Sequence, residues 1–306
     1  MSILGRSIER AMRLSRVAGL SAALIDAGEV VEIEGFGLGE GGDGITADTV
    51  FAVASLSKPP FALLVLRLCD RGLLDLDTPL AGLLPEPYSA FGLDPEAPAL
   101  LRITARHVLS HTSGLGNMQA DDSGRILFPP GTRWHYSGEG FLFLQAVIEH
   151  VVGSPLELVA ADEVFRPLRM LSTSYLWRPE CDSSAQGHEF RNASAAFSLH
   201  TNAGDYARFV VHTLQSEIGE ILLAPQVAVD DSIAWGLGWG LAGDLFWHWG
   251  EMSDFESVAV ASRAERRGLV CLANSPHGLR ACVEILVEVL GREYAYPIRA
   301  VLERGW

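Results

Sequence analysis

Segments with the pattern of β-strands lie near the two ends of this 306-residue chain, while the middle has the apolar spacing of helices. Near the N-terminus, residues 21–25 and the alternating segment 30–33 flank the turn Asp26-Ala27-Gly28, as in a β-hairpin. Further strands are predicted over residues 233–241, 245–249, 256–262 and 268–273. The predicted fold class is therefore α/β of the α+β type: an antiparallel sheet flanked by terminal helices, with a helical subdomain inserted between its strands.

Helical segments fill the interval between the two groups of strands. The first twenty residues, MSILGRSIERAMRLSRVAGL, place apolar residues at helical spacing between arginines. Further helices are predicted over residues 55–71, 104–109, 137–152, 156–165, 203–214 and 277–290. The expected organisation is a discontinuous sheet domain, residues 1–55 and 225–306, a mostly helical subdomain over residues 56–224, and an active site between the two.

Charge and hydropathy argue against several classes of partner. The 23 basic and 38 acidic side chains give a formal net charge of −15, so neither nucleic acid nor an anionic membrane surface is expected to bind. The longest apolar stretch, residues 61–66, is far shorter than the roughly 20 residues that cross a bilayer. Because the N-terminal segment lacks the apolar centre of a signal peptide, a cytoplasmic location is predicted. The oligomeric state is left open.

Neither a metal nor an organic cofactor is expected. The cysteines have no Cys-x-x-Cys spacing, which is typical of small buried residues in a reducing compartment; they are Cys69, Cys181, Cys271 and Cys282. His107 and His111 have the i, i+4 spacing of a helical zinc site, but Val108 stands where His-Glu-x-x-His has its glutamate. A structural role for this segment is the favoured interpretation.

Lys58 is the only lysine in the chain, since the other basic residues are all arginine. Lysine can lose its proton in a protein and arginine cannot. Ser55 lies three residues earlier, so a helix would bring its hydroxyl within reach of the amine. A neutral Lys58 could take the Ser55 proton and create a nucleophile. A serine at this spacing also arises by chance beside about one lysine in fifteen, so the pair needs other support.

Four motifs supply that support: FAVASLSK, ITARHVLSHTSGL, GTRWHYSGEGFLFLQAVIEHVVG and FWHWGEMSDF. In this order the chain resembles the serine β-lactamase and penicillin-binding-protein superfamily, and more narrowly the branch of class C β-lactamases and family VIII carboxylesterases. The resemblance implies a β-lactamase-like fold. It implies that Ser55 is the acylated nucleophile, Lys58 its proton acceptor, and Tyr136 a phenol that relays protons in both half-reactions.

The same resemblance assigns roles to His248-Trp249-Gly250, which stands where β-lactamases of this type carry Lys-Thr-Gly. The glycine would let a sheet-edge strand approach the substrate. The backbone N–H of Glu251 would join that of Ser55 as the oxyanion hole, and His248 would polarise or orient the tyrosine.

Departures from the β-lactamase pattern favour a small or apolar ester. Gly138 replaces the asparagine of Tyr-x-Asn, and Trp249 replaces a hydroxyl that helps to hold a substrate carboxylate. Pro59 and Pro60 follow the nucleophile motif directly, and prolines deeper than the first helical turn distort a helix. Some distortion is expected there unless Ser55 lies in a turn before the helix.

Tryptophans are concentrated on the last strands, at positions 235, 239, 247 and 249. Alternation along a strand points Trp247 and Trp249 to one face and His248 to the other. Core packing against a terminal helix is the favoured interpretation; an aromatic wall for the substrate is the alternative.

The sequence therefore predicts a serine hydrolase that cleaves a small-molecule ester through an acyl-serine intermediate. Acyl transfer to an alcohol or amine on the same fold is an alternative, as are β-lactamase or D-amino-acid peptidase activity. A binding protein that keeps the fold without catalysis is the alternative from a different class.

Overall fold

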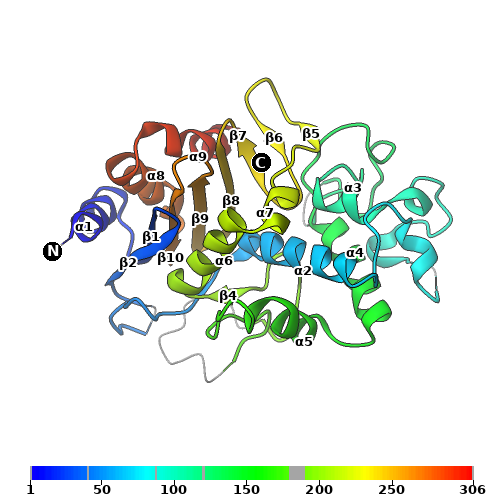
Figure 1. Ribbon diagram of the computed structural model, residues 1–306, viewed down its shortest axis with the longest axis horizontal. Helices are drawn as coiled ribbons and strands as arrows, with labels where there is room; N and C mark the ends of the chain where they lie inside the picture. Colours follow the sequence, from blue (N-terminus) through cyan, green and yellow to red (C-terminus); the bar gives the residue numbers. More distant parts are fainter. Residues whose placement is uncertain (1, 40, 87, 119–120, 179–189, 305–306) are drawn as a thin grey trace.

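An eight-stranded antiparallel sheet forms the centre of the protein, in the order β2-β1-β10-β9-β8-β7-β6-β5 (Figure 1). The computed structural model describes residues 2–39, 41–86, 88–118, 121–178 and 190–304. The strands of this sheet are β1 (Gly19–Asp26), β2 (Glu29–Gly37), β5 (Val227–Ala228), β6 (Ala234–Trp235), β7 (Gly240–Ala242), β8 (Leu245–Met252), β9 (Phe255–Ser262) and β10 (Arg267–Ala273). Strands from both ends of the chain therefore share one sheet, as predicted.

Helices cover both faces of this sheet (Figure 1). One face packs against α1 (Ile3–Ser15), α8 (Gly278–Val289) and α9 (Arg292–Arg304). The other face packs against α2 (Lys58–Asp70) and α6 (Ala203–Gln215). The remaining helices are α3 (Ala105–Leu109), α4 (Gly138–Val152), α5 (Leu156–Ala160) and α7 (Glu217–Leu222). A two-stranded sheet pairs β3 (Phe51–Ala52) with β4 (His200–Thr201).

Strand alternation divides the core into two clusters. Trp247 and Trp249 pack on the side of α1, α8 and α9, together with Val258 of β9. Phe246 and Ala259 pack on the opposite side, with α2 and α6. The expected orientation of the two tryptophans on β8 is therefore confirmed, since each residue position alternates between the two faces.

Several segments differ from the sequence prediction, among them β3, β4, β5 and α7, which were not predicted. Residues 233–241 form two short strands, β6 and β7, instead of one, because Gly238 adopts a left-handed conformation (φ +79°) that interrupts the strand. Helix α9 was not predicted, and Pro297 inside it is a residue that normally argues against a helix. The predicted helix 55–71 begins instead with a 3₁₀ turn, η1 (Ala54–Ser57), followed by α2.

A close backbone contact joins this 3₁₀ turn to the sheet. A Cβ atom on Gly250 of β8 would lie 2.0 Å from the carbonyl oxygen of Val53, so only glycine fits there. The same carbonyl accepts a hydrogen bond of 3.0 Å from the Ser257 hydroxyl on β9. The immediate neighbour of Gly250 is thus the segment that precedes η1, and the predicted approach of this strand to a substrate stays a prediction. Gly250 thus fixes that segment against the strand.

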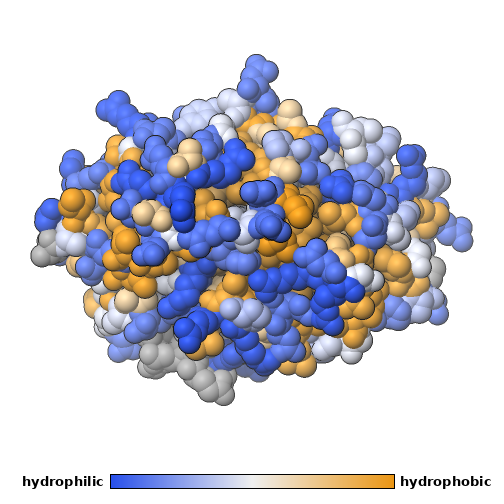
Figure 2. Space-filling model, viewed as in Figure 1, coloured by the Kyte–Doolittle hydropathy of each residue, from blue (hydrophilic) through white to orange (hydrophobic). Residues whose placement is uncertain are grey.

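The outer surface in Figure 2 shows hydrophilic side chains spread over most of the visible face, with apolar patches between them. Among the described residues, no single helix has the length and apolar character of a membrane span. One pair, α4 with residues 156–165, passes on length and composition together, but it is bent by 80°.

Replacing Gly250 with alanine should destabilise the fold strongly. The new methyl group would overlap the Val53 carbonyl, and overpacking of this kind lowers the free energy of unfolding by about 3 kcal/mol. Urea denaturation followed by tryptophan fluorescence measures the change. Gly82→Ala is the matched control, because nothing lies within 4 Å of its Cβ position, and it should shift stability by less than about 1 kcal/mol. Equal stabilities of the two variants would contradict the contact.

Candidate active site

Ser55 and Lys58 meet at the junction of η1 and α2. The Lys58 ammonium donates a hydrogen bond of 3.0 Å to the Ser55 hydroxyl and one of 2.7 Å to the backbone carbonyl of Ala196. Its Nζ also lies 4.9 Å from the centroid of the Tyr136 ring and 5.5 Å from that of Phe141. The lysine side chain is only 2% exposed, whereas Ser55 is half-buried. The structure therefore brings the predicted nucleophile, its base and the tyrosine together.

Burial lowers the pKa of Lys58 from 10.5 to about 7. The physical cause is the loss of water around the ammonium, since the partners that it gains are a hydroxyl, a carbonyl and two ring faces, none of which carries a full negative charge. A large fraction of the amine is then neutral near neutral pH. This is the form that can accept a proton from Ser55.

The two prolines after Lys58 lie at the start of α2, where the lack of a backbone N–H costs the helix no internal hydrogen bond. Pro59 and Pro60 occupy the first turn of α2, whose N–H groups have no partner within the helix. Pro60 nevertheless deprives the Leu56 carbonyl of a donor four residues on, and the Tyr206 hydroxyl donates to that oxygen instead at 3.0 Å. Ser55 thus lies in a turn before the helix proper, the one arrangement for which no distortion was expected.

Tyr136 lies in the residues that lead into α4. Its ring stacks on His111 at a centroid distance of 4.3 Å and lies 5.2 Å from the ring of Trp249. The hydroxyl oxygen is buried, and the Ser55 hydroxyl is its neighbour. Burial raises the pKa of the phenol, and the neighbouring Ser55 hydroxyl acts in the opposite direction. Tyr136 is therefore protonated at neutral pH, with its hydroxyl close to that of the serine.

His107 and His111 each use a ring nitrogen for the backbone. Nδ1 of His111 accepts a hydrogen bond of 3.0 Å from the Ser137 N–H, and Nδ1 of His107 accepts one of 3.3 Å from the Thr104 N–H. His111 holds a left-handed backbone (φ +55°), and burial keeps its pKa well below the usual value. The structural interpretation of the two histidines fits these contacts. Sequence reasoning missed the role of His111 as the support on which Tyr136 stacks.

His248 and Trp249 lie near the end of β8. Trp249 contacts Tyr136 although it belongs to the core on the side of α8, because β7 pairs with β8 only as far as Trp247. The favoured interpretation of Trp249, core packing, is thus confirmed, and an aromatic wall for the substrate stays a prediction. His248 is fully buried on the opposite face, where Lys58 is close enough to lower the pKa of the imidazole.

The same lack of pairing leaves one edge of β8 unpaired by β7 from His248 onward. Gly250 is buried and Glu251 is exposed at this edge. The predicted oxyanion role of the Glu251 and Ser55 N–H groups stays a prediction. Gly138 begins α4, and its N–H donates a hydrogen bond of 3.0 Å to the Asn117 side chain. An amide from another segment thus lies beside the position where β-lactamases carry their asparagine.

Cys271 and Cys282 are buried and Cys69 is half-buried, and all three are free thiols. Cys181 lies outside the described residues.

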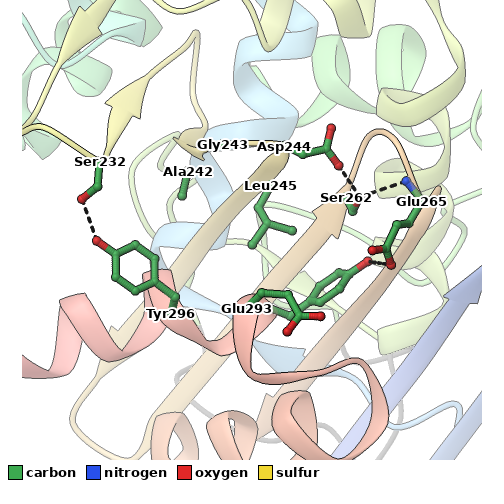
Figure 3. A pocket seen from close by; sticks show the side chains of 10 residues that line it. Ser232, Ala242, Gly243, Asp244, Leu245, Ser262, Glu265, Glu293 and Tyr296 are labelled. Carbon is green, nitrogen blue, oxygen red and sulfur yellow. Dashed lines mark hydrogen bonds between the residues drawn. The ribbon is translucent and has the colours of Figure 1, made fainter.

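A separate cavity of about 450 Å³ lies at the opposite end of β8, between the β7–β8 turn and α9 (Figure 3). Among its hydroxyl groups, Ser262 donates to Asp244 and Tyr294 donates to Glu265 at 2.8 Å, while the hydroxyls of Ser232 and Tyr296 bond to each other at 2.6 Å. The only lysine of the chain, Lys58, is not among its lining residues. The cavity therefore offers no serine activated by a neutral amine.

A buried lysine bonded to a serine at the start of a helix, in an α+β fold with a tyrosine alongside, defines the Ser-x-x-Lys class of proteins. A model of the Beta-lactamase family matches residues 4–288. The chain belongs to this family, which confirms the predicted family and fold class.

Relatives of known name include an esterase. Esterase EstB of Burkholderia gladioli is 32% identical over 201 residues, covering 55% of this chain and 50% of EstB. Penicillin-binding protein 4 of Amycolatopsis lactamdurans is 31% identical over 169 residues, covering 50% of this chain and 43% of that protein. The matched part thus spans about half the length of these curated relatives.

Solved structures agree with the fold. The octameric penicillin-binding protein homologue from Pyrococcus abyssi superposes with a TM-score of 0.79 at 20% identity, over 98% of this chain and 81% of that chain. EstCE1, described as a hydrolase with promiscuous acyltransferase activity, gives a TM-score of 0.77 at 19% identity, over 94% of this chain and 99% of that one. At such identities the likeness concerns the fold alone.

The single lysine permits a direct measurement of its pKa. Protein grown with ¹³C-labelled lysine should give one set of side-chain signals, and their pH titration should have a midpoint at about 7 in the folded protein. The amine is protonated below this pH and neutral above it. The same signals in urea should titrate near the ordinary value of 10.5, which serves as the control. A folded midpoint near 10.5 would contradict the role of Lys58 as a base.

Proposed function

We propose that this protein is a serine hydrolase that cleaves a small or apolar ester through an acyl-serine intermediate. The observation that carries this proposal is the 3.0 Å hydrogen bond between Ser55 and a lysine whose pKa burial lowers to about 7. Membership of the Beta-lactamase family and the similarity to an esterase support it.

The acylation step follows from the positions of three side chains. Neutral Lys58 takes the proton of Ser55 as the serine oxygen forms a bond to the ester carbonyl carbon. The N–H groups of Ser55 and Glu251 stabilise the negative charge that develops on the carbonyl oxygen. When the bond to the alcohol oxygen breaks, Tyr136 protonates the leaving alkoxide, and the Lys58 ammonium returns a proton to the phenolate. The acyl group then remains on Ser55.

Deacylation runs through the same groups in reverse. Water attacks the acyl carbon and gives up a proton to the Lys58 and Tyr136 pair. The bond to the Ser55 oxygen breaks, and the serine recovers its proton as the acid leaves. Since each half-reaction leaves Lys58 and Tyr136 in their starting protonation states, the scheme needs no cofactor.

Further features of the proposal follow from sequence. We carry forward the domain division, residues 1–55 and 225–306 against residues 56–224, with the site between the two parts. Ser55 and Lys58 lie at their boundary in the sequence and His248 lies on β8. The partner is a small ester or acyl molecule. The cytoplasmic location and the absence of nucleic acid and membrane partners are carried forward as predictions from the charge and from the N-terminal segment.

Acyl transfer is the second candidate function. Acyltransferase calJ of Penicillium decumbens is 33% identical over 128 residues, which cover 31% of this chain and 30% of that protein. An alcohol that replaced water in deacylation would turn the hydrolase into an acyltransferase without any change at Ser55. Comparing the ratio of transferred to hydrolysed acyl groups with and without added alcohol separates the two.

Mutation of Ser55 to alanine should abolish covalent labelling. Wild-type protein exposed to p-nitrophenyl esters or a fluorophosphonate should gain the mass of one acyl or phosphonyl group, with release of nitrophenol from the esters. Ser55→Ala should gain no mass, as measured by intact-protein mass spectrometry. Ser89→Ala is the matched control, because Ser89 is exposed and its side chain caps no helix. Labelling of the Ser55→Ala variant would refute the assignment.

Mutation of Tyr136 to phenylalanine should lower kcat by about 10²–10⁴-fold, the usual contribution of a positioned acid or base. The phenyl ring keeps the stacking on His111, so the loss reports on the hydroxyl alone. Tyr296→Phe, at an exposed tyrosine beside the separate cavity, should leave kcat unchanged. A decrease of less than tenfold for Tyr136→Phe would exclude it as the proton relay.

A further inference from the structure

His248 has one ring nitrogen with a partner and one without. Its Nδ1 lies 2.7 Å from the backbone carbonyl oxygen of Trp249. A carbonyl oxygen can only accept a hydrogen bond, so Nδ1 carries the proton. In the neutral imidazole, Nε2 then has a bare lone pair and can act only as an acceptor.

This lone pair is buried and has no hydrogen-bond donor in the described part of the chain. The side chain is 0% exposed, and Nε2 makes no hydrogen bond there. The surrounding rings are aromatic: Trp249 at 5.3 Å, Trp235 at 5.6 Å and Tyr136 at 6.3 Å between centroids. A buried polar atom of this kind normally has a partner, because burying it without one is unfavourable.

The imidazole also stays uncharged. Burial, with a further contribution from Lys58, lowers the pKa of His248 to about 3, so protonation does not convert Nε2 into a donor near neutral pH. The His248 imidazole therefore differs from the ammonium of Lys-Thr-Gly in charge as well as in shape. An ammonium attracts a carboxylate, whereas a lone pair repels one and attracts an O–H or N–H group.

We propose that Nε2 of His248 accepts a hydrogen bond from an uncharged O–H or N–H group of the substrate, so that the preferred ester is neutral and carries such a donor close to its carbonyl group. Esters that carry a carboxylate at that position are rejected. This inference rests on the proposed esterase function, because the donor is recognised in the same site that acylates Ser55.

A panel of p-nitrophenyl esters of similar size tests the inference. Butyrate has no donor, 2-hydroxybutyrate and 3-hydroxybutyrate offer a hydroxyl group at two positions, N-acetylglycine offers an N–H group, and succinate offers a carboxylate. For the wild-type protein, kcat/KM should be at least about tenfold higher for one of the donor esters than for butyrate. Succinate should be poorer than butyrate.

Two variants assign the preference to His248. His248→Phe keeps an aromatic ring but has no acceptor, so the ratio of kcat/KM between donor ester and butyrate should fall to about one. His248→Gln offers a carbonyl oxygen and should restore part of the ratio. Thermal melting and fluorophosphonate labelling of Ser55 verify that each variant is folded and has a reactive serine. If His248→Phe fails to fold, the inference is decided by the wild-type panel and His248→Gln.

The outcomes separate this inference from the proposed function. Acylation of wild-type Ser55 with equal kcat/KM for donor esters and butyrate would overturn the inference and leave the esterase proposal intact. A fall in kcat/KM that is uniform over the panel in His248→Phe would also overturn it, and would make His248 a positioning residue for Tyr136. Failure of every ester to acylate wild-type Ser55 would overturn both.

Discussion

Burial of a single ammonium group is the constraint on which the rest of the site depends. Removing the Lys58 amine from water is unfavourable for its charged form, and the protein offers it a hydroxyl, a carbonyl and ring faces instead of a carboxylate. A carboxylate partner would have kept the amine protonated and useless as a base. The carbonyl belongs to Ala196, 138 residues further along the chain, so the base acquires its surroundings only when distant segments have folded together.

The turn that carries Ser55 is held from two sides. From the sheet, the Val53 carbonyl lies against Gly250 and accepts a hydrogen bond from Ser257. From the helical part, hydroxyl groups of Tyr206 and Tyr175 donate to the carbonyls of Leu56 and Ser57. The bond from Tyr206 replaces the donor that Pro60, four residues after Leu56, cannot supply. Holding both ends of a short 3₁₀ turn in this way fixes the serine oxygen against the amine, which is the pre-organisation that acyl transfer requires.

Local patterns in the sequence predicted the parts of this site that are themselves local. The spacing of Ser55 and Lys58 was sufficient to predict their contact, and strand alternation was sufficient to place Trp247 and Trp249 on one face. The supports were not predictable, because Tyr175 and Tyr206 bond to residues 118 and 150 positions away. Hydrogen bonds between residues so far apart in the chain leave no periodic pattern in the sequence. The broken strand at Gly238 was missed for a related reason, since its left-handed backbone is an outcome of packing against α2 and not of its neighbours in sequence.

The electrostatic character of the site follows from how few charges it contains. Burial lowers the pKa of both His111 and His248, and Lys58 lowers each of them further, so a positive charge on the amine disfavours one on either imidazole. Both histidines are buried and neutral near neutral pH, and the phenol of Tyr136 keeps its proton. At most one positive charge therefore exists at the reacting centre. In the proposed mechanism Lys58 is neutral before the reaction, and the charge appears on its amine only when it takes the Ser55 proton. Such a site gives no fixed cation to bind a carboxylate, and it suits an ester that is neutral before the reaction and gains negative charge only in the transition state.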